Sequence, residues 1–278
     1  MNQFLKWRIL PFQVLDAFDN MAIDEAVLMG ADSGCSPPTL RFYGWAPAAV
    51  SLGYFQNYEK EVNAEACLAL GIDIVRRPTG GKAVLHENEI TYSVVASRDN
   101  PLFPDTILGT YKVISSCLAG ALASMGVKAS IAEDTPPQSR SDGLQSFCFS
   151  DPSRFELLAS GRKICGSAQV RVKNAFLQHG SLLLGFDPHK TARALFRNPA
   201  PNAEEALARS VTSMADFQDS ASGIDIKEAL IESFRKELGI ELFEENLSPE
   251  EEVNRANLLR GKYLTRFWNV TGHLNQPS

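Results

Sequence analysis

The chain has 278 residues, 44% of them hydrophobic, and a formal net charge of −6. This length and composition suit one large domain with its own core, and the acidic balance without a long basic run excludes most nucleic-acid-binding classes. The N-terminus lacks the pattern of a signal peptide and no apolar run is long enough to span a membrane, so we expect a cytoplasmic protein without a membrane partner. The five cysteines form no CxxC pair, which argues against a disulfide framework or a metal site.

The first half of the chain predicts short strands that alternate with helices. Apolar residues recur at helical spacing over 18–29, Asn63 can cap a helix that ends near Gly71, and a long helix over 106–125 precedes Gly126. Runs rich in β-formers predict strands over residues 7–11, 39–43, 49–53, 72–76, 83–86 and 90–96.

The second half opens with a polar loop over 133–146, and Cys148 follows it. Strands over 155–158 and 163–170 around a Ser160-Gly161 turn predict a hairpin, and another strand follows over 176–184. Beyond Pro188 the pattern is helical, and a capping box over 248–251 opens the last helix. The sequence therefore predicts an α+β fold, a mixed sheet with flanking helices, in a single domain over 1–278. We expect its core over about 36–245 and a C-terminal helical segment over 246–278.

The segment from Arg76 to His86 is the most informative part of the chain. It places Arg76-Arg77 before the glycine pair Gly80-Gly81 and Lys82. Adjacent glycines allow close approach of a ligand, and guanidinium groups can hold phosphate or carboxylate oxygens. An ordinary hairpin turn with solvated arginines fits the same spacing. The segment matches neither a P-loop nor the three-glycine dinucleotide motif.

Cys148 and Lys163 are the candidate chemical groups. Cys148 lies between Phe147 and Phe149, either as a nucleophile at a pocket or as an apolar loop anchor. Lys163 follows the hairpin turn and precedes a run of small residues, either as a functional cation or as a solvated lysine. Neither His86 nor His179 has metal-ligand spacing, so each is a pocket wall or a hydrogen-bonded structural residue.

Several separated motifs resemble the lipoate-protein ligase and octanoyltransferase superfamily, in the same order along the chain. The stretch 76–95 carries its signature, and further matches are found at residues 41–45, 53–56, 161–169 and 177–181. The closest likeness is to the LipM type of octanoyltransferase, which has a Cys-Phe, then a Pro-Ser element, then a Gly-Arg-Lys hairpin. Here these are Cys148-Phe149, Pro152-Ser153 and the hairpin that carries Lys163.

The resemblance implies the catalytic-domain fold of the biotin and lipoate protein ligases. It implies transfer of octanoyl from acyl carrier protein to a lysine of a lipoyl domain, such as that of the glycine cleavage H protein. Cys148 would carry the acyl group as a thioester and Lys163 would stabilise its thiolate. We expect a monomer that uses no cofactor or metal, with substrate contacts at Arg76, Gly80, Gly81, Lys82, His86, Gly166, Ser167 and His179.

Three alternatives stay open. An ATP-dependent lipoate ligase shares the arginine-glycine signature and needs no cysteine. An amidotransferase that takes octanoyl from the H protein also uses a cysteine thioester. A non-catalytic module that binds lipoyl domains would keep the fold and show no turnover.

Overall fold

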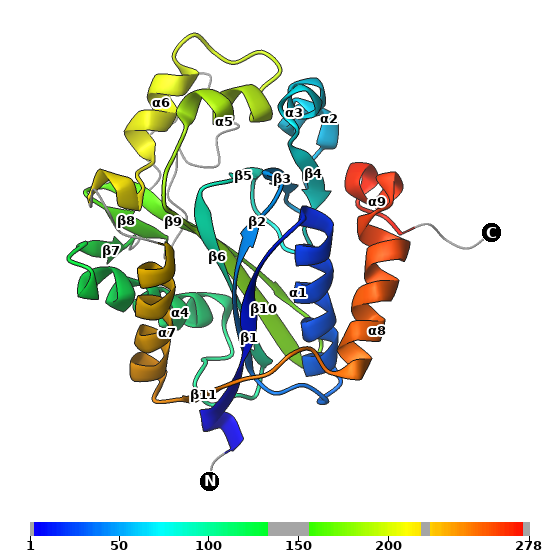
Figure 1. Ribbon diagram of the computed structural model, residues 1–278, viewed down its shortest axis with the longest axis vertical. Helices are drawn as coiled ribbons and strands as arrows, with labels where there is room; N and C mark the ends of the chain where they lie inside the picture. The colour runs from blue at the N-terminus through cyan, green and yellow to red at the C-terminus, as the bar shows by residue number, and fades with distance from the viewer. Residues whose placement is uncertain (1–2, 133–155, 218–222, 275–278) are drawn as a thin grey trace.

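The computed structural model describes residues 3–132, 156–217 and 223–274, and an eight-stranded mixed sheet forms its centre (Figure 1). Its strand order is β11-β1-β2-β6-β10-β9-β8-β7. The strands are β1 (Lys6–Leu15), β2 (Thr39–Trp45), β6 (Glu89–Ser97), β7 (Ala129–Ile131), β8 (Leu157–Ala159), β9 (Arg162–Arg171), β10 (Ala175–Leu183) and β11 (Glu241–Glu244). β1 runs parallel to both β2 and β11, and the other neighbours in the sheet are antiparallel.

A second, three-stranded sheet lies at one end of the first (Figure 1). It consists of β3 (Ala49–Leu52), flanked by β4 (Asp73–Arg76) on one side and β5 (Val84–His86) on the other. The Arg77–Lys82 loop connects β4 to β5, so the small sheet carries the most informative segment of the sequence.

Helices cover both faces of the large sheet (Figure 1). One face carries α1 (Ala17–Asp32) with α8 (Pro249–Leu258) behind it, and the other carries α4 (Ile107–Ser124) and α7 (Gly223–Leu238). The main core cluster lies between the sheet and the α4–α7 layer, where apolar side chains of both elements are buried. The remaining helical segments are η1 (Gln3–Leu5), α2 (Tyr58–Glu61), α3 (Ala64–Leu70), α5 (Pro188–Leu195), α6 (Ala203–Ser210), η2 (Met214–Asp216), η3 (Leu259–Tyr263) and α9 (Arg266–Thr271).

The predicted α+β class is confirmed, and most element predictions hold. Asn63 caps α3 through a hydrogen bond from the Ala66 amide, α4 ends at Ser124 with Met125 as its C-cap directly before Gly126, and β8 and β9 form the predicted hairpin. Trp7, in the strand predicted over 7–11, lies in the main core cluster.

Two predictions for the C-terminal part are wrong. β11 is a strand where only helix was expected, and its partner is β1, more than two hundred residues away. The four residues of β11 are mostly exposed, so they lack the apolar alternation that would have indicated a strand. The capping box at Ser248 does open a helix, α8, but the π-helical η3 and then α9 follow it.

α4 is the one helix, among the described residues, that is long and apolar enough to cross a membrane by length and composition. The sequence had suggested no such run. Ile114, Cys117, Leu118 and Leu122 of α4 are buried in the main core cluster, and α4 packs against α7. Its apolar character is therefore explained by its place in the core.

Candidate active site

A cavity of about 130 Å³ opens where the two sheets meet. Backbone pairing explains this position, because Thr91, Ser181 and Gly166 lie side by side on β6, β10 and β9, below the small sheet. Seven of the ten predicted site residues line the cavity, namely Gly81, Lys82, His86, Lys163, Gly166, Ser167 and His179. The fold therefore brings together predicted residues that lie up to about a hundred positions apart in the sequence.

His86 is held between a hydroxyl and a carboxylate. Its Nε2 lies 2.7 Å from Ser51 Oγ and its Nδ1 lies 2.8 Å from Glu89 Oε1. Its ring stacks on Trp45, with centroids 4.1 Å apart and planes 14° apart. Both ring nitrogens are therefore engaged, and one face of the imidazole is covered by an aromatic ring.

His179, on β10 of the large sheet, has the same arrangement. Its Nε2 lies 2.8 Å from Thr79 Oγ1 and its Nδ1 lies 3.1 Å from Asp24 Oδ2. Burial lowers the pKa of His179, although the carboxylate of Asp24 opposes the shift. Asp24 also pairs with Arg41 at 2.8 Å; burial raises its pKa, but the hydrogen bond from His179 and the charge of Arg41 lower it more.

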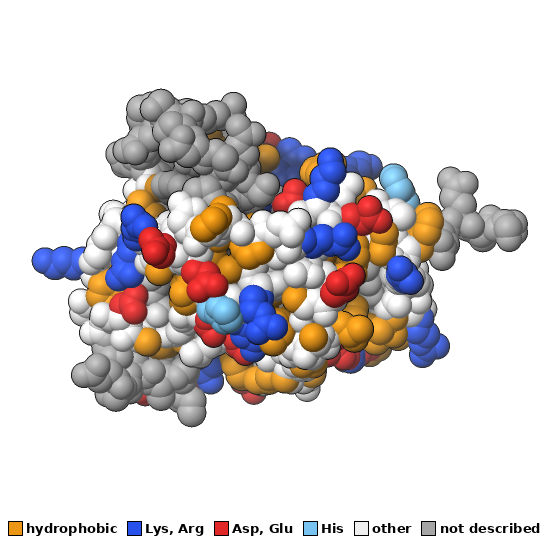
Figure 2. Space-filling model, turned by 90° about the horizontal axis from the view of Figure 1, so that it is seen from above, with side chains coloured by type: hydrophobic (Ala, Val, Ile, Leu, Met, Phe, Trp, Pro, Cys, Tyr) orange, Lys and Arg blue, Asp and Glu red, His pale blue; other side chains and the backbone are white. Residues whose placement is uncertain are grey.

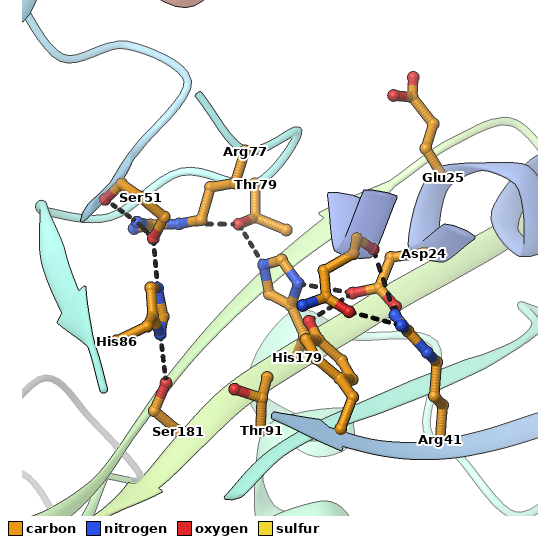
Figure 3. A network of polar contacts seen from close by, with 12 residues as sticks. Asp24, Glu25, Arg41, Ser51, Arg77, Thr79, His86, Thr91, His179 and Ser181 are labelled. Atoms are coloured by element: carbon orange, nitrogen blue, oxygen red, sulfur yellow. Dashed lines mark hydrogen bonds and ion pairs between the residues drawn. The ribbon is translucent and has the colours of Figure 1, made fainter. Parts of the chain in front are cut away.

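Arg77 joins the two histidine arms (Figure 3). It donates to Ser51 Oγ at 3.0 Å and to Thr79 Oγ1 at 3.1 Å. Because each hydroxyl accepts from Arg77, its single hydrogen is available to the imidazole Nε2 beyond it. In this order of hydrogen bonds each imidazole accepts at Nε2, and the N–H on Nδ1 is directed at the carboxylate. The network is continuous from Glu89 to Asp24.

Arg76 does not face the cavity, contrary to the expected substrate contact. Its side chain is buried, with 1% exposure. Its guanidinium donates to five backbone carbonyls, those of Gly53, Tyr54, Gln56, Trp268 and Val270. The first arginine of the pair is thus a structural brace. Gly80 is also absent from the cavity wall, and its carbonyl accepts two hydrogen bonds from Arg77.

Lys163 is buried and ion-paired, so it is not a solvated turn lysine. Its Nζ lies 2.6 Å from Glu156 Oε1, and the two side chains are 3% and 5% exposed. A Cβ built on Gly166 would lie 3.0 Å from Lys163 Cε, so the glycine leaves the space over which the lysine stem runs. Both partners line the cavity.

The cysteines differ sharply in their surroundings. Cys148 lies outside the described residues, as do the two phenylalanines beside it. Burial raises the pKa of Cys67 to about 11 and that of Cys117 and Cys165 to about 12, although the charge of Lys163 opposes the shift at Cys165. These three thiols are core residues, whereas Cys35 is exposed.

Sequence reasoning missed several polar members of the site, among them Asp24, Glu156, Ser51 and Thr79. Asp24 lies four residues after Asn20, so both lie on the buried, sheet-facing side of α1. An acidic residue on the apolar side of a predicted helix is unusual, and this was a usable signal in the sequence. The hairpin turn placed Glu156 near Lys163, but an irregularity in the β8–β9 register decides the pairing. Ser51 and Thr79 carried no signal of their own, because hydroxyl residues are common at strand ends and turns.

The sequence matches the family described as the lipoyl protein ligase A/B catalytic domain over residues 16–235. It is similar to the octanoyltransferase LipM of Geobacillus kaustophilus, with 39% identity over 277 residues that cover 95% of this chain and 97% of the relative. It is also similar to the octanoyltransferase LipM of Kyrpidia tusciae, with 41% identity over 270 residues that cover 95% and 98%.

Solved structures share the fold. A lipoate-protein ligase A bound with ATP superposes with a TM-score of 0.80 at 28% identity, covering 95% of this chain and 98% of that one. A structure from an archaeal lipoylation system, described as a bipartite lipoate protein ligase and its E2 lipoyl domain from Thermoplasma acidophilum, superposes with a TM-score of 0.82 over 99% of this chain and 100% of that one. Its identity of 24% supports the fold alone. The fold predicted from the motifs is confirmed.

Proposed function

The chain belongs to the lipoyl protein ligase A/B catalytic-domain family, with octanoyltransferases of the LipM type as its relatives, and from this premise we propose a two-step octanoyl transfer. The donor is octanoyl-acyl carrier protein. The acceptor is a lysine of a lipoyl domain, such as that of the glycine cleavage H protein. The reaction belongs to lipoate biosynthesis, and Cys148 carries the acyl group between the two proteins.

In the first step the thiolate of Cys148 attacks the carbonyl carbon of the donor thioester. A C–S bond to the enzyme forms, the C–S bond to the carrier breaks, and the carrier thiolate leaves and takes up a proton. In the second step the amine of the acceptor lysine attacks the acyl-enzyme. A C–N bond then forms, the enzyme C–S bond breaks, and the amine proton passes to the released thiolate.

The buried ammonium of Lys163 is the observation that carries this proposal. A lysine is rarely buried without a task or a partner, and this one lies at the cavity wall. A cation at that place favours a thiolate and stabilises the negative charge that develops on the thioester oxygen. The backbone amides of Gly166 and Ser167, both on the cavity wall, are further candidate donors to that oxygen.

The walls of the cavity suit an acyl chain at one side and polar chemistry at the other. Apolar atoms are supplied by Met21, Trp45, Val84 and Leu183. Each buried CH₂ of an acyl tail contributes ~0.8 kcal/mol to binding. An octanoyl chain therefore gains enough from burial to be selected without a charged contact.

The face that carries α3, α5 and α6 has a mixed surface (Figure 2). Figure 2 shows basic, acidic and apolar side chains interspersed on it. Lys190 pairs with Glu87 and His189 pairs with Glu204 there. Arg76 is buried and Arg162 pairs with Asp216 at 3.2 Å, so neither adds an unpaired charge. Docking of a carrier protein on this face would depend on a few local pairs of charged side chains.

Intact-mass analysis after incubation with octanoyl-acyl carrier protein tests the proposal. We expect one octanoyl adduct without ATP, assigned by peptide mapping to Cys148. The adduct should disappear when the lipoyl domain is added and in the Cys148→Ala variant. Cys35→Ala, which removes the exposed cysteine, is the matched control and should be acylated as the parent is. Acylation that survives Cys148→Ala would refute the thioester route.

A ligase reaction is the second candidate, because the chain is 28% identical to a lipoate-protein ligase A that was solved with ATP bound. The same experiment with free octanoate, ATP and the lipoyl domain separates the two. Product that requires ATP and does not require Cys148 would favour the ligase. Charging of Cys148 by octanoyl-H-protein alone would instead assign the amidotransferase reaction.

A further inference from the structure

The Lys163–Glu156 ion pair is nearly sealed from solvent. The Nζ–Oε1 distance is 2.6 Å, and both side chains are at most 5% exposed. A buried ammonium without a compensating charge costs several kcal/mol, and such a lysine generally loses its proton instead. The charge of Lys163 therefore depends on what lies beside it.

Other titratable groups approach the pair from several elements. Cys165 on β9 interacts electrostatically with Lys163, Glu156 and Glu89, and Tyr111 on α4 interacts with Glu156 and Arg77. The positive charge of Arg77 opposes a second cation in the cavity. Glu89 is already used by His86 and Thr91. Glu156 is the carboxylate that hydrogen-bonds Lys163 directly.

We propose that Glu156 is a positioning residue for acyl transfer, which keeps Lys163 charged and holds its ammonium beside Gly166. This inference rests on the proposed function for its role in the reaction. Gly166 provides the space for the lysine stem, and Glu156 fixes the end of the stem.

Glu156→Gln tests the proposal, because it removes the charge and preserves the shape. The variant removes the carboxylate that lies 2.6 Å from Lys163 Nζ, so a larger fraction of Lys163 should be the neutral amine. Only a neutral amine reacts with acetic anhydride, so acetylation of Lys163 at pH 7 should rise by about tenfold. Peptide mass mapping of Lys163 after a short acetylation pulse measures this rate. This measurement needs no acyl donor. A negative result therefore contradicts the present inference without bearing on the proposed octanoyl transfer.

Alkylation of Cys148 gives the second readout. Glu156→Gln and Lys163→Ala should both slow iodoacetamide labelling of Cys148 at pH 7, by about tenfold each, and shift the pH profile upward. The double variant should be no slower than Lys163→Ala, because Glu156 acts through Lys163. Glu156→Asp retains the charge and should restore part of the parent rate.

Glu251→Gln is the matched control, because Glu251 forms a pair with Arg8 that is equally buried, at 2.6 Å, far from the cavity. It should lower the free energy of unfolding and leave both labelling rates unchanged. Unchanged acetylation of Lys163 in Glu156→Gln would overturn the proposal, as would effects that multiply in the double variant. If Glu156→Gln does not fold, Glu156→Asp must show intermediate acetylation, and a parent-like rate overturns the proposal.

Discussion

His179 shows how burial sets the charge of one side chain. It is 5% exposed, and its Nδ1 and Nε2 lie within hydrogen-bond distance of Asp24 and Thr79. Burial lowers its pKa from the ordinary value of 6.5, so the folded protein holds the neutral imidazole. The neutral state of His179 agrees with the direction of the hydrogen bonds, in which Arg77 donates to Thr79 Oγ1 and Thr79 in turn donates to His179 Nε2.

A pH-dependent stability follows for this residue. Below pH 6.5 the unfolded chain takes up a proton at His179 that the folded chain refuses. The free energy of unfolding should therefore fall as the pH drops below 6.5, by up to ~1.4 kcal/mol per pH unit until the folded-state pKa is reached. Urea unfolding at pH 5, 6, 7 and 8 measures the slope.

His179→Gln should flatten the part of the slope between pH 6.5 and 5, whatever it does to stability at pH 7. Asp24 does not contribute in this window, because its pKa lies below 3.8. Parallel curves for parent and variant would show that His179 is not held neutral by burial.

The loop between β4 and β5 depends on close packing against the end of β3. A Cβ on Gly53 would lie 1.9 Å from the carbonyl oxygen of Gly81, so only glycine allows the two backbones to approach. Gly81 itself has φ of +91°. The two glycine positions together place Arg77 and Lys82 against the cavity.

Gly53→Ala should therefore displace the loop. We expect a loss of about 1–3 kcal/mol in the free energy of unfolding and a marked loss of octanoyl transfer, measured by urea unfolding and by acyl-enzyme formation. Gly261→Ala is the control, because nothing lies within 4 Å of a Cβ built there. It should keep full transfer and equal or higher stability. Equal transfer by Gly53→Ala would show that the loop position does not matter.

Element patterns were largely readable from the sequence, because helix periodicity, caps and hairpin turns act over a few residues. The Asn63 cap, the α4 helix and the Ser160-Gly161 turn are examples. β11 was missed because its structure comes from pairing with β1 and not from its own pattern. Long-range pairing of short, exposed strands leaves little trace in local sequence.

At the scale of the whole molecule, Arg76 joins the segment after β3 to α9, the last helix. Its guanidinium holds carbonyls of residues 53–56 and of α9, and Trp268 Nε1 donates back to the Arg76 carbonyl at 2.9 Å. Asn269 Oδ1 accepts from the Arg76 amide at 2.9 Å. Segments more than two hundred residues apart are thus joined at one buried side chain.

Arg76→Lys should break this junction, because an ammonium cannot reach five carbonyls at once. We expect a loss of about 2–4 kcal/mol in the free energy of unfolding and faster amide exchange in α9, measured by urea unfolding and hydrogen exchange. Arg209→Lys, in an exposed pair with Glu205, should change stability by less than about 1 kcal/mol. Unchanged exchange in α9 of Arg76→Lys would contradict the bracing role.

The amino-acid sequence alone was enough to establish the family, the α+β class and seven of the residues around the cavity, because motif spacing and local periodicity act within the sequence itself. It could not tell which arginine of the pair faces the cavity, since neighbouring side chains on a strand point to opposite sides. It also could not show that Lys163 is paired with Glu156 or that His179 is neutral. Charge states depend on desolvation and on neighbours, and these exist only once distant segments are packed together.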